Sequence, residues 1–544
     1  MKHKLFVIIF ALVACLKGHS QTFTSSNLPI IIIETNGINI VDNPKITAKM
    51  KIINNGVGKR NNVIDNADDY NGLVGIELRG SSSQSFPKKP YGFETRDDKG
   101  AGLTVSLLGF PKEQDWILYA AYNEKTLLHN VMAMQMFRDM GAYASRTQHV
   151  EMVLNGKYEG VYVLMEKIKR DGDRVSVPKM TTTDNAGDAL TGGYIFKIDK
   201  TTGSDQPLGW TSKIKPTESR FGQVTNFYYD YPSPANITPQ QKAYLKTYVD
   251  SAEVALSATN FRDPKNGYQK FFGVSSFVRI FLMNEVAKNI DGYRISTFFH
   301  KDRHSKDRRI KAGPAWDYDI AFGNADYCSA ERYQGWSYLF GSECPEDYWQ
   351  VPFYWKRMLE DSTFSKELRG QYTALRKGAW KTTRLHATID SLAGYLDESQ
   401  KRNFVRWPVL GVYVWPNPRP LPTTYQGQIT NFKAWLAARL DWLDGYLFGT
   451  ITANAEETTI SNLSLEVSPN PFSEQLNLKI RANYKMEAML EVIDSNGRTI
   501  QNNLQILENG TNNLTLPVQG AAGMYFLRIH TNKGVLSKKI IKTN

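Results

Sequence analysis

Cysteine, long apolar runs and blocks of like charge are all scarce in this sequence of 544 residues. It has three cysteines, and two of them, Cys328 and Cys344, follow the first twenty residues. Two lone cysteines without a nearby histidine favour a disulfide over a metal site. Beyond the N-terminal segment no eighteen consecutive residues are apolar, so no transmembrane helix is predicted. Because no five like charges adjoin, the net charge of +12 indicates a solvated basic surface rather than a nucleic-acid tract.

The sequence contains enough apolar residues to build packed hydrophobic cores. Hydrophobic residues make up 41% of the chain and aromatic residues 12%, which excludes a disordered or fibrous protein. The length predicts two to four domains.

The first twenty residues resemble a secretion signal. Lys2 and Lys4 precede an apolar run over residues 5–14, and small or polar residues continue to Ser20. We expect cleavage after Ser20. The alternative is a lipoprotein, in which Cys15 would be acylated and would anchor the protein to a membrane.

Short apolar runs separated by turns predict a β-rich first part with one early helix. The hairpin signal Asn155-Gly156 is the strongest in the chain. The predicted strands are 29–34, 45–53, 73–78, 87–94, 115–122, 150–154, 161–165 and 192–198, and the predicted helix is 126–140.

A serine-rich loop, Arg79-Gly-Ser-Ser-Ser-Gln-Ser-Phe86, lies between two of these strands. Its small residues, including Ser81 and Ser82, would let backbone N–H groups approach a phosphate, and Lys88 and Lys89 follow on the next predicted strand. A serine-rich hairpin without a ligand is the alternative.

The second part of the chain is predicted to be mainly helical. Residues 201–240 are polar and indicate an insertion or long loop, and His300 and His304 are interpreted as solvated residues of a hairpin turn rather than as metal ligands. The predicted helices are 238–256 and 274–288, followed by a largely helical stretch over 352–449, interrupted at 408–422. Trp355, Trp380, Trp407, Trp435 and Trp442 are predicted core residues.

Three carboxylates, Asp291, Asp317 and Asp319, lie in otherwise apolar and aromatic segments. Burying one carboxylate costs several kcal/mol unless a cation or hydrogen-bond donors compensate its charge. A divalent metal or a reacting proton between them would explain all three. The alternative is that Asp317 and Asp319 only cap a turn.

After a linker at 450–460, about 85 residues alternate as strands and turns and predict a small β-sandwich. This segment resembles the type A sorting domain of the type IX secretion system of Bacteroidetes. The resemblance implies recognition by that secretion machinery, passage through the periplasm and outer membrane, removal of the domain, and an ordinary signal peptide. It is carried by LEVSPNPF at 465–472, EVIDSNG at 491–497, GMYFLRI at 523–529 and KKIIK at 538–542.

The region from about Leu28 to Leu447 resembles the CotH family of atypical secreted protein kinases. The resemblance implies a kinase-like fold that binds ATP with Mg²⁺ or Mn²⁺ and acts on a protein substrate. It is carried by IELRGSSSQ at 76–84, FPKKPY at 86–91, DWIL at 115–118, LNGKYEGVY at 154–162, EKIKR at 166–170 and GPAWDYDIAFG at 313–323.

The resemblance also implies roles for individual residues. Asp291 matches the catalytic aspartate, which accepts the proton of the attacking hydroxyl, and Asp317 matches the metal-binding aspartate. Asp319 would add a ligand directly or through water. Lys88 or Lys89, with Arg79 and the serine loop, would contact the nucleotide phosphates. Glu166 is a candidate partner or further metal ligand.

Three positions depart from the family pattern. Ser296 stands where an asparagine often supplies a second metal ligand, Gln135 stands where a helix often offers a glutamate, and the phosphate loop carries serines instead of glycines. A catalytically silent pseudokinase that acts as a surface-binding or structural module is therefore the rival hypothesis. A carbohydrate-acting enzyme is a third and weaker one.

The sequence as a whole predicts an α+β kinase-like domain, β-rich at its N-terminal side and helical at its C-terminal side, followed by a small all-β sandwich. The expected segments are a signal peptide (1–20), the CotH-like domain (21–449), the linker (450–460) and the sorting domain (461–544). We expect the protein to be an exported kinase that phosphorylates Ser or Thr hydroxyls and binds no nucleic acid.

Overall fold

The computed structural model describes residues 23–200, 208–447, 463–494, 499–531 and 534–543. The predicted signal peptide and linker lie outside these residues. Contacts divide the chain into two compact units. We call them the barrel unit (Met1–Tyr122, Arg146–Lys167 and Gly394–Val409) and the helical unit (Asn123–Ser145, Ile168–Ala393 and Leu410–Asn544). Each is described by itself.

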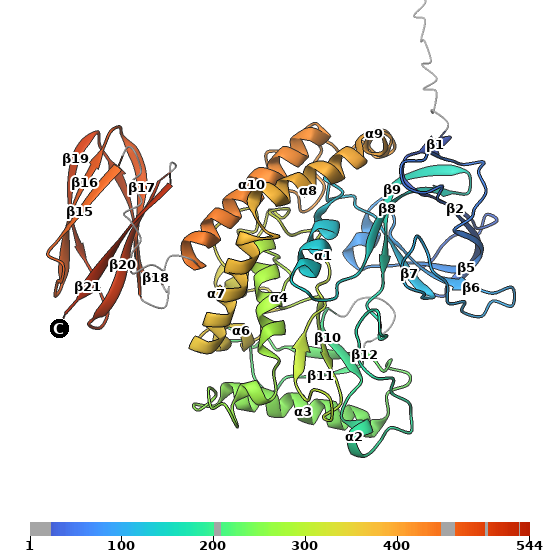
Figure 1. The fold of residues 1–544 in the computed structure, drawn as a ribbon, viewed down its shortest axis with the longest axis horizontal. Coiled ribbons are helices and arrows are strands. Elements are labelled where there is room, and N and C mark those ends of the chain that lie inside the picture. Colours follow the sequence, from blue (N-terminus) through green and yellow to red (C-terminus); the bar gives the residue numbers. More distant parts are fainter. Residues whose placement is uncertain (1–22, 201–207, 448–462, 495–498, 532–533, 544) are drawn as a thin grey trace, which may run out of the picture. The chain divides into compact units, whose positions relative to one another are not determined.

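Seven strands of the barrel unit close on themselves (Figure 1). Their inward side chains alternate with outward ones, as Ala48, Met50 and Ile52 show on β3, so the apolar residues of period two form one core. The β2–β8 pair is parallel and the other pairs are antiparallel. In barrel order the strands are β2 (Ile30–Glu34), β3 (Ile46–Ile53), β5 (Tyr70–Leu78), β6 (Tyr91–Arg96), β7 (Asp115–Tyr119), β9 (Lys157–Glu166) and β8 (Thr147–Leu154).

Smaller elements complete the barrel unit. The strands β1 (Ser25–Ser26) and β4 (Asn61–Asn62) pair with each other, and the 3₁₀ turn η1 (Ser82–Ser85) lies in the serine-rich loop. The helix α9 (Asp397–Arg406) packs against β9. The strand expected at 87–94 begins only at Tyr91, because Pro87 and Pro90 cannot donate to a strand ladder.

Within residues 168–393, the helical unit contains a five-stranded antiparallel sheet in the order β11–β12–β10–β13–β14. Two of these strands fall within residues 201–240, where a loop was expected, so that prediction was wrong for this part. The aromatic run Asn226–Tyr231 pairs with β10 although it lacks clear alternation. The strands are β11 (Gly209–Thr211), β12 (Asn226–Tyr231), β10 (Tyr194–Ile198), β13 (Thr297–Lys301) and β14 (Ile310–Ala312).

The helix α4 (Val274–Ala287) is the most deeply buried helix of this unit. It is apolar on nearly all sides and contacts β14 as well as α1, α7 and α10, which Figure 1 labels. Its C-cap is Lys288, whose backbone is left-handed with φ 41°. The other helices are α1 (His129–Asp139), α2 (Gly187–Leu190), α3 (Pro239–Ser257), α5 (Phe340–Glu343), α6 (Tyr354–Met358), α7 (Ser362–Lys377), α8 (Thr382–Tyr395) and α10 (Tyr425–Leu447), with 3₁₀ turns η2 (Tyr268–Lys270) and η3 (Ser337–Leu339).

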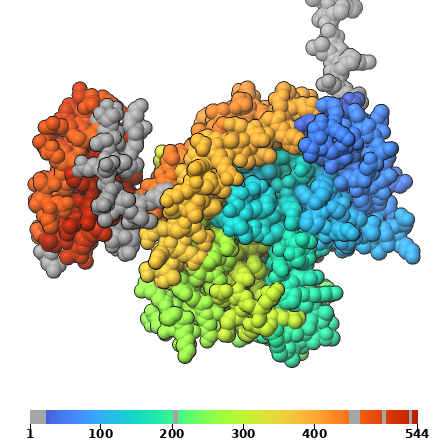
Figure 2. Space-filling view, viewed as in Figure 1, coloured from blue at the N-terminus to red at the C-terminus, as the bar shows by residue number. Residues whose placement is uncertain are grey.

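The helix α3 shows how local sequence sets an element boundary. Pro239 occupies its first turn, and the N-cap Thr238 forms a reciprocal capping box with Gln241 of the same turn. Figure 2 shows this helix, in light green, on the surface of the helical unit, and Val254 on it is exposed.

The C-terminal part is the predicted sandwich of two antiparallel sheets. One sheet has the order β15–β16–β19 and the other β18–β17–β20–β21, and side chains of both form one apolar cluster. The strands are β15 (Leu463–Ser468), β16 (Gln475–Ala482), β19 (Gly510–Pro517), β18 (Thr499–Leu507), β17 (Met486–Asp494), β20 (Gly523–Thr531) and β21 (Gly534–Lys542).

The structure is thus mixed α and β, β-rich at the N-terminal side, helical in the middle and β again at the C-terminus, which confirms the predicted class in this coarse form. Trp355, Trp380 and Trp407 are buried as expected, whereas Trp435 and Trp442 are half-buried. In the described ranges we find no helix with the length and apolar character needed to span a bilayer.

Candidate functional site

Asp291 lies in the turn that follows α4, and its carboxylate is held by Arg294. The Arg294 guanidinium, which is 2% exposed, donates to Asp291 Oδ1 at 2.8 Å and to Asp347 Oδ1 at 3.1 Å. It also lies 3.9 Å from the centre of the Phe340 ring. Because the arginine is buried and fully engaged, it fixes the orientation of Asp291.

Asp317 follows β14 and faces the segment that carries Ser296. Both residues have left-handed backbones, with φ 63° at Asp317 and φ 49° at Ser296. Ser296 Oγ donates to Asp317 Oδ2 at 3.5 Å, and Asn289 Nδ2 donates to the Asp317 carbonyl at 3.3 Å. Non-glycine residues in this region store about 1–3 kcal/mol each and gather at functional sites.

Tyr318, between the two aspartates, anchors the turn in the core. Its backbone N–H donates to Asn130 Oδ1 at 2.8 Å and its hydroxyl to Asn284 Oδ1 at 2.7 Å. A buried residue between two polar ones sets the position of both. These two hydrogen bonds hold the turn against the core more firmly than the cap of an exposed turn would need.

Asp319 has a strongly perturbed carboxyl group. Burial, the negative charges of Asp317 and Asp291, and a hydrogen bond with Asp317 raise its pKa well above the usual value, and Glu124 adds to the effect. The structure therefore brings the three predicted aspartates together within the helical unit. Their mutual repulsion is relieved by a shared proton or by a cation.

The carboxylates of Asp317 and Asp319 are oxygen ligands of the kind that a divalent cation such as Mg²⁺ prefers. Among the residues that the structure describes, no three His, Cys, Asp or Glu side chains are arranged to hold a metal ion by themselves. Mg²⁺ commonly takes one or two protein carboxylates and completes its octahedron with phosphate and water oxygens. Asp317 and Asp319 supply that number.

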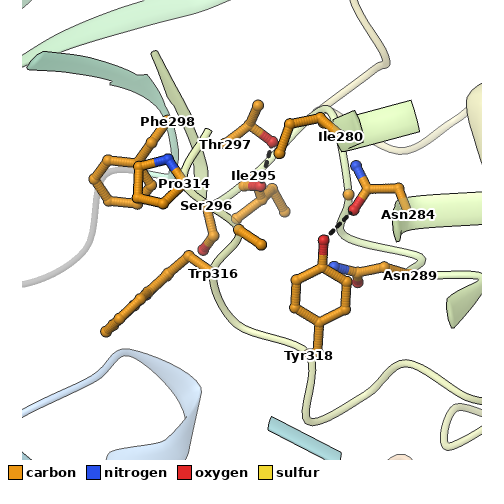
Figure 3. Close-up of a pocket in the computed structure, with 12 residues that line it drawn as sticks. Ile280, Asn284, Asn289, Ile295, Ser296, Thr297, Phe298, Pro314, Trp316 and Tyr318 are labelled. Atoms are coloured by element: carbon orange, nitrogen blue, oxygen red, sulfur yellow. Dashed lines mark hydrogen bonds between the residues drawn. The ribbon is translucent and has the colours of Figure 1, made fainter. Parts of the chain in front are cut away.

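A small pocket adjoins the cluster. Figure 3 shows Ser296 and Trp316 on its wall, with Tyr318 bonded to Asn284 at another side. Asn289, whose Oδ1 accepts from the Asp291 N–H at 3.2 Å, also lines it. The pocket therefore borders both segments that carry the carboxylates.

The predicted disulfide joins Cys328 and Cys344, with their Cα atoms 5.7 Å apart. It ties the loop that follows Asp319. The ammonium group of Lys288 donates to the carbonyls of Arg332 at 2.8 Å and Gln334 at 2.6 Å in the same loop.

The predicted nucleotide residues belong to the barrel unit. Lys88 is 1% exposed and donates to the carbonyls of Ala121 and Val161 and, at 2.9 Å, to Asn403 Oδ1. Lys89 donates to the Gln84 carbonyl at 2.6 Å. Both lysines precede β6 rather than lie on it.

The remaining predicted residues of this unit have local partners. The carbonyl of Ser81 accepts from the Gln84 N–H at 3.2 Å, Ser82 begins η1, and the Arg79 N–H donates to the Pro90 carbonyl at 3.2 Å. Glu166 is fully buried and paired with Arg146 at 2.8 Å.

Several contributors to the site were not predicted. Arg294 follows Asp291 by three residues, and this spacing of opposite charges is visible in the sequence. Asp199, which accepts from the Ser296 N–H at 3.4 Å, and Glu124 are distant in sequence, and no local pattern marks them. His300 corrects another expectation: it lies on β13, not in the turn, and its ring is only partly exposed.

Comparison with protein families decides which group the chain belongs to. The family model described as CotH kinase protein matches residues 76–443, more than half of the sequence. The chain belongs to the CotH family. A curated CotH relative is the inner spore coat protein H of Bacillus subtilis (strain 168), 22% identical over 300 residues that make up 53% of this chain and 70% of the relative.

The C-terminal strands of this CotH family member match a second family model. Residues 466–543 match the secretion system C-terminal sorting domain, which indicates export by the type IX system to the cell surface or the medium. A solved structure, dimeric latent PorU from Porphyromonas gingivalis, matches at 18% identity with a TM-score of 0.14 and covers 17% of this chain and 10% of its own. The chain thus spans a tenth of that protein.

Proposed function

We propose that this protein transfers the γ-phosphoryl group of ATP to Ser or Thr hydroxyls of secreted or surface proteins. The cluster of Asp291, Asp317 and Asp319 carries the proposal. Membership of the CotH family supports it, and the sorting domain gives it a location. Phosphoryl transfer needs mainly positioning and charge neutralisation, and this cluster suits both needs.

Asp291 is the proposed proton acceptor. The substrate hydroxyl oxygen bonds to the γ-phosphorus while the bond from that phosphorus to the bridging oxygen breaks and ADP leaves. The hydroxyl proton passes to the Asp291 carboxylate, which Arg294 holds in place at 2.8 Å.

Asp317 and Asp319 are the proposed ligands of Mg²⁺ or Mn²⁺, with Ser296 beside them. When bound, the metal ion neutralises charge on the phosphate oxygens. The high pKa of the Asp319 carboxyl group arises from burial and from neighbouring carboxylates, and a cation in the proton's place removes this repulsion.

In the barrel unit, Arg79, Ser81, Ser82 and Lys89 remain the proposed contacts of the nucleotide phosphates. Lys88 and Glu166 are proposed with them on the strength of the resemblance. To act in this way, Lys88 would have to exchange its three internal acceptors for phosphate oxygens. Glu166 would have to exchange Arg146 for a metal ion or another partner.

Those partners also favour the second candidate, a pseudokinase that binds at the surface without catalysis. The three protons of the Lys88 ammonium group match three internal acceptors. Gln135 on α1 is exposed and bonded to Asp139 at 3.0 Å, where the family often has a glutamate. Ser296 replaces the expected asparagine.

The deciding experiment uses the purified full chain with labelled ATP, Mn²⁺ or Mg²⁺ and a mixture of exported proteins. Variants Asp291→Asn and Asp317→Asn are compared with Asp98→Asn, an exposed carboxylate in the barrel unit. Metal-dependent thermal shifts are measured in parallel, because they report metal binding without catalysis.

We expect label transfer that Asp98→Asn retains and both site variants lose, with the metal-dependent shift lost only in Asp317→Asn. A metal- and nucleotide-dependent shift without any transfer establishes the pseudokinase. Transfer that survives Asp317→Asn contradicts the metal assignment.

A further inference from the structure

A second cavity of the helical unit has a different chemical character. It measures about 170 Å³ and lies among α4, β13, β14, the end of α1 and residues 174–176. It shares only Pro314 with the pocket of Figure 3. We call it the Arg279 pocket.

Its lining is cationic. Arg174, Arg279 and Lys311 contribute three positive charges, and no Asp or Glu lines the cavity. Arg174 pairs with Asp171 at 2.5 Å and Lys311 with Asp307 at 3.2 Å. Arg279 is half-buried on α4 and forms no ion pair or hydrogen bond through its side chain with any other described residue.

The secondary structure holds these groups at fixed positions. Ser276 and Arg279 are three residues apart and share one face of α4. His300 and Lys311 are direct partners across the β13–β14 pair. Two walls of the pocket are therefore a helix and a strand pair, which position side chains more firmly than loops do, while Arg174 comes from a loop.

His300 contributes a neutral ring. Its Nδ1 donates to the Gly313 carbonyl at 3.1 Å, and burial lowers its pKa to about 4. At neutral pH the ring adds no charge, and its Nε2 is left as a hydrogen-bond acceptor.

We propose that the Arg279 pocket binds a phosphate group, either inorganic phosphate or the headgroup of a small phosphomonoester, with Arg279 as its principal contact. Guanidinium groups bind tetrahedral oxyanions through paired N–H donors, and such charge-assisted bonds are about twice as strong as neutral ones. A cavity of about 150 Å³ holds a benzene molecule, so this one, of about 170 Å³, accommodates a phosphate group. The site is independent of the proposed kinase activity.

The test measures binding of labelled inorganic phosphate to the full chain by equilibrium dialysis at constant ionic strength. EDTA is present, so that no metal ion recruits phosphate to Asp317. The variants are Arg279→Gln and Arg279→Lys. Arg220→Gln is the matched control, because it removes one exposed arginine of the same unit that lies outside the pocket.

We expect saturable binding to the wild type, about tenfold or more weaker binding to Arg279→Gln, an intermediate affinity for Arg279→Lys and no change for Arg220→Gln. O-phosphoserine that competes with the label identifies a monoester ligand, and failure to compete identifies the free ion. Binding that is absent in the wild type, or equal in wild type and Arg279→Gln, overturns the proposal. If Arg279→Gln fails to fold, unaltered binding by the charge-reduced but folded Lys311→Gln overturns it equally.

Discussion

Ser296 Oγ donates a 3.5 Å hydrogen bond to Asp317 Oδ2, which joins the segment after α4 to the segment after β14. A serine hydroxyl therefore lies beside the carboxylate that we propose as a metal ligand. Both residues have a left-handed backbone, and asparagine adopts this conformation more readily than serine or any β-branched residue.

The first prediction concerns this position. Ser296→Asn should fold normally and bind Mn²⁺ about tenfold more tightly, because a carbonyl oxygen is added beside Asp317. Ser296→Val should lose about 1–2 kcal/mol of unfolding free energy, because its branched side chain opposes positive φ. Titration calorimetry and chemical denaturation measure the two effects. Equal Mn²⁺ affinity in Ser296→Asn and Ser296→Ala would contradict a ligand role.

A second prediction separates two roles of Lys88. Lys88→Met should lower the unfolding free energy by about 2–4 kcal/mol, because it leaves buried acceptors, including two backbone carbonyls, without their donor. Lys89→Met, which removes a partly exposed donor to Gln84, should cost less than about 1 kcal/mol. Urea denaturation tests both. If Lys88→Met kept full stability and lost only ATP affinity, the ammonium group would be a phosphate ligand.

A third prediction concerns pH. Burial raises the pKa of Glu253 to about 7, although Ser212 and Tyr354 donate to its carboxyl group at 2.7 and 2.8 Å. Between pH 4.5 and 7 the folded chain keeps this proton while the unfolded chain loses it. The contribution of Glu253 to stability is therefore fully present below pH 4.5 and falls as the pH rises to 7, by about 3 kcal/mol.

The measurement for Glu253 is the difference in unfolding free energy between wild type and Glu253→Gln at several pH values. The opposite effect of His300, whose pKa is lowered to about 4, is present in both proteins and cancels. A difference that stays constant from pH 4.5 to 7 would show that Glu253 titrates normally.

A fourth prediction concerns the disulfide. Cys328→Ser combined with Cys344→Ser should lower the unfolding free energy by about 3 kcal/mol, because the bond closes a loop with a sequence separation of 16. Reduced wild-type protein should match the double variant, and both should be compared with oxidised wild type by denaturation. Equal stability of all three would mean that the loop is held by other contacts alone.

The sequence predicted the parts of the fold that depend on local pattern. Alternation over residues 45–53 identified β3, the Asn155-Gly156 turn identified the β8–β9 hairpin, and the apolar run of 274–288 identified α4 within one residue. The strand β12 was not predicted, because its aromatic run does not alternate. Its strand character comes from pairing with β10.

The site was predictable in the same partial way. Asp317 and Asp319 lie two residues apart in one apolar and aromatic segment, and Asp291 lies in a second such segment. The sequence alone was therefore enough to single out these three carboxylates. The environment of Lys88 comes from residues 121, 161 and 403, and that of Asp319 includes Glu124, so burial and pairing at these positions depend on the tertiary fold.

The loop after Asp319 is fastened at three points within the helical unit. The Cys328–Cys344 bond closes it, Lys288 donates to its carbonyls, and Arg439 of α10, fully buried, donates to the Tyr333 and Gly335 carbonyls at 2.7 and 2.6 Å. Moving this loop away as a unit would leave two buried cations without their carbonyl partners, and the disulfide between two of its own residues limits how far the loop can change shape. The loop beside the site is therefore expected to reach its final shape when the two thiols are oxidised during maturation of the chain.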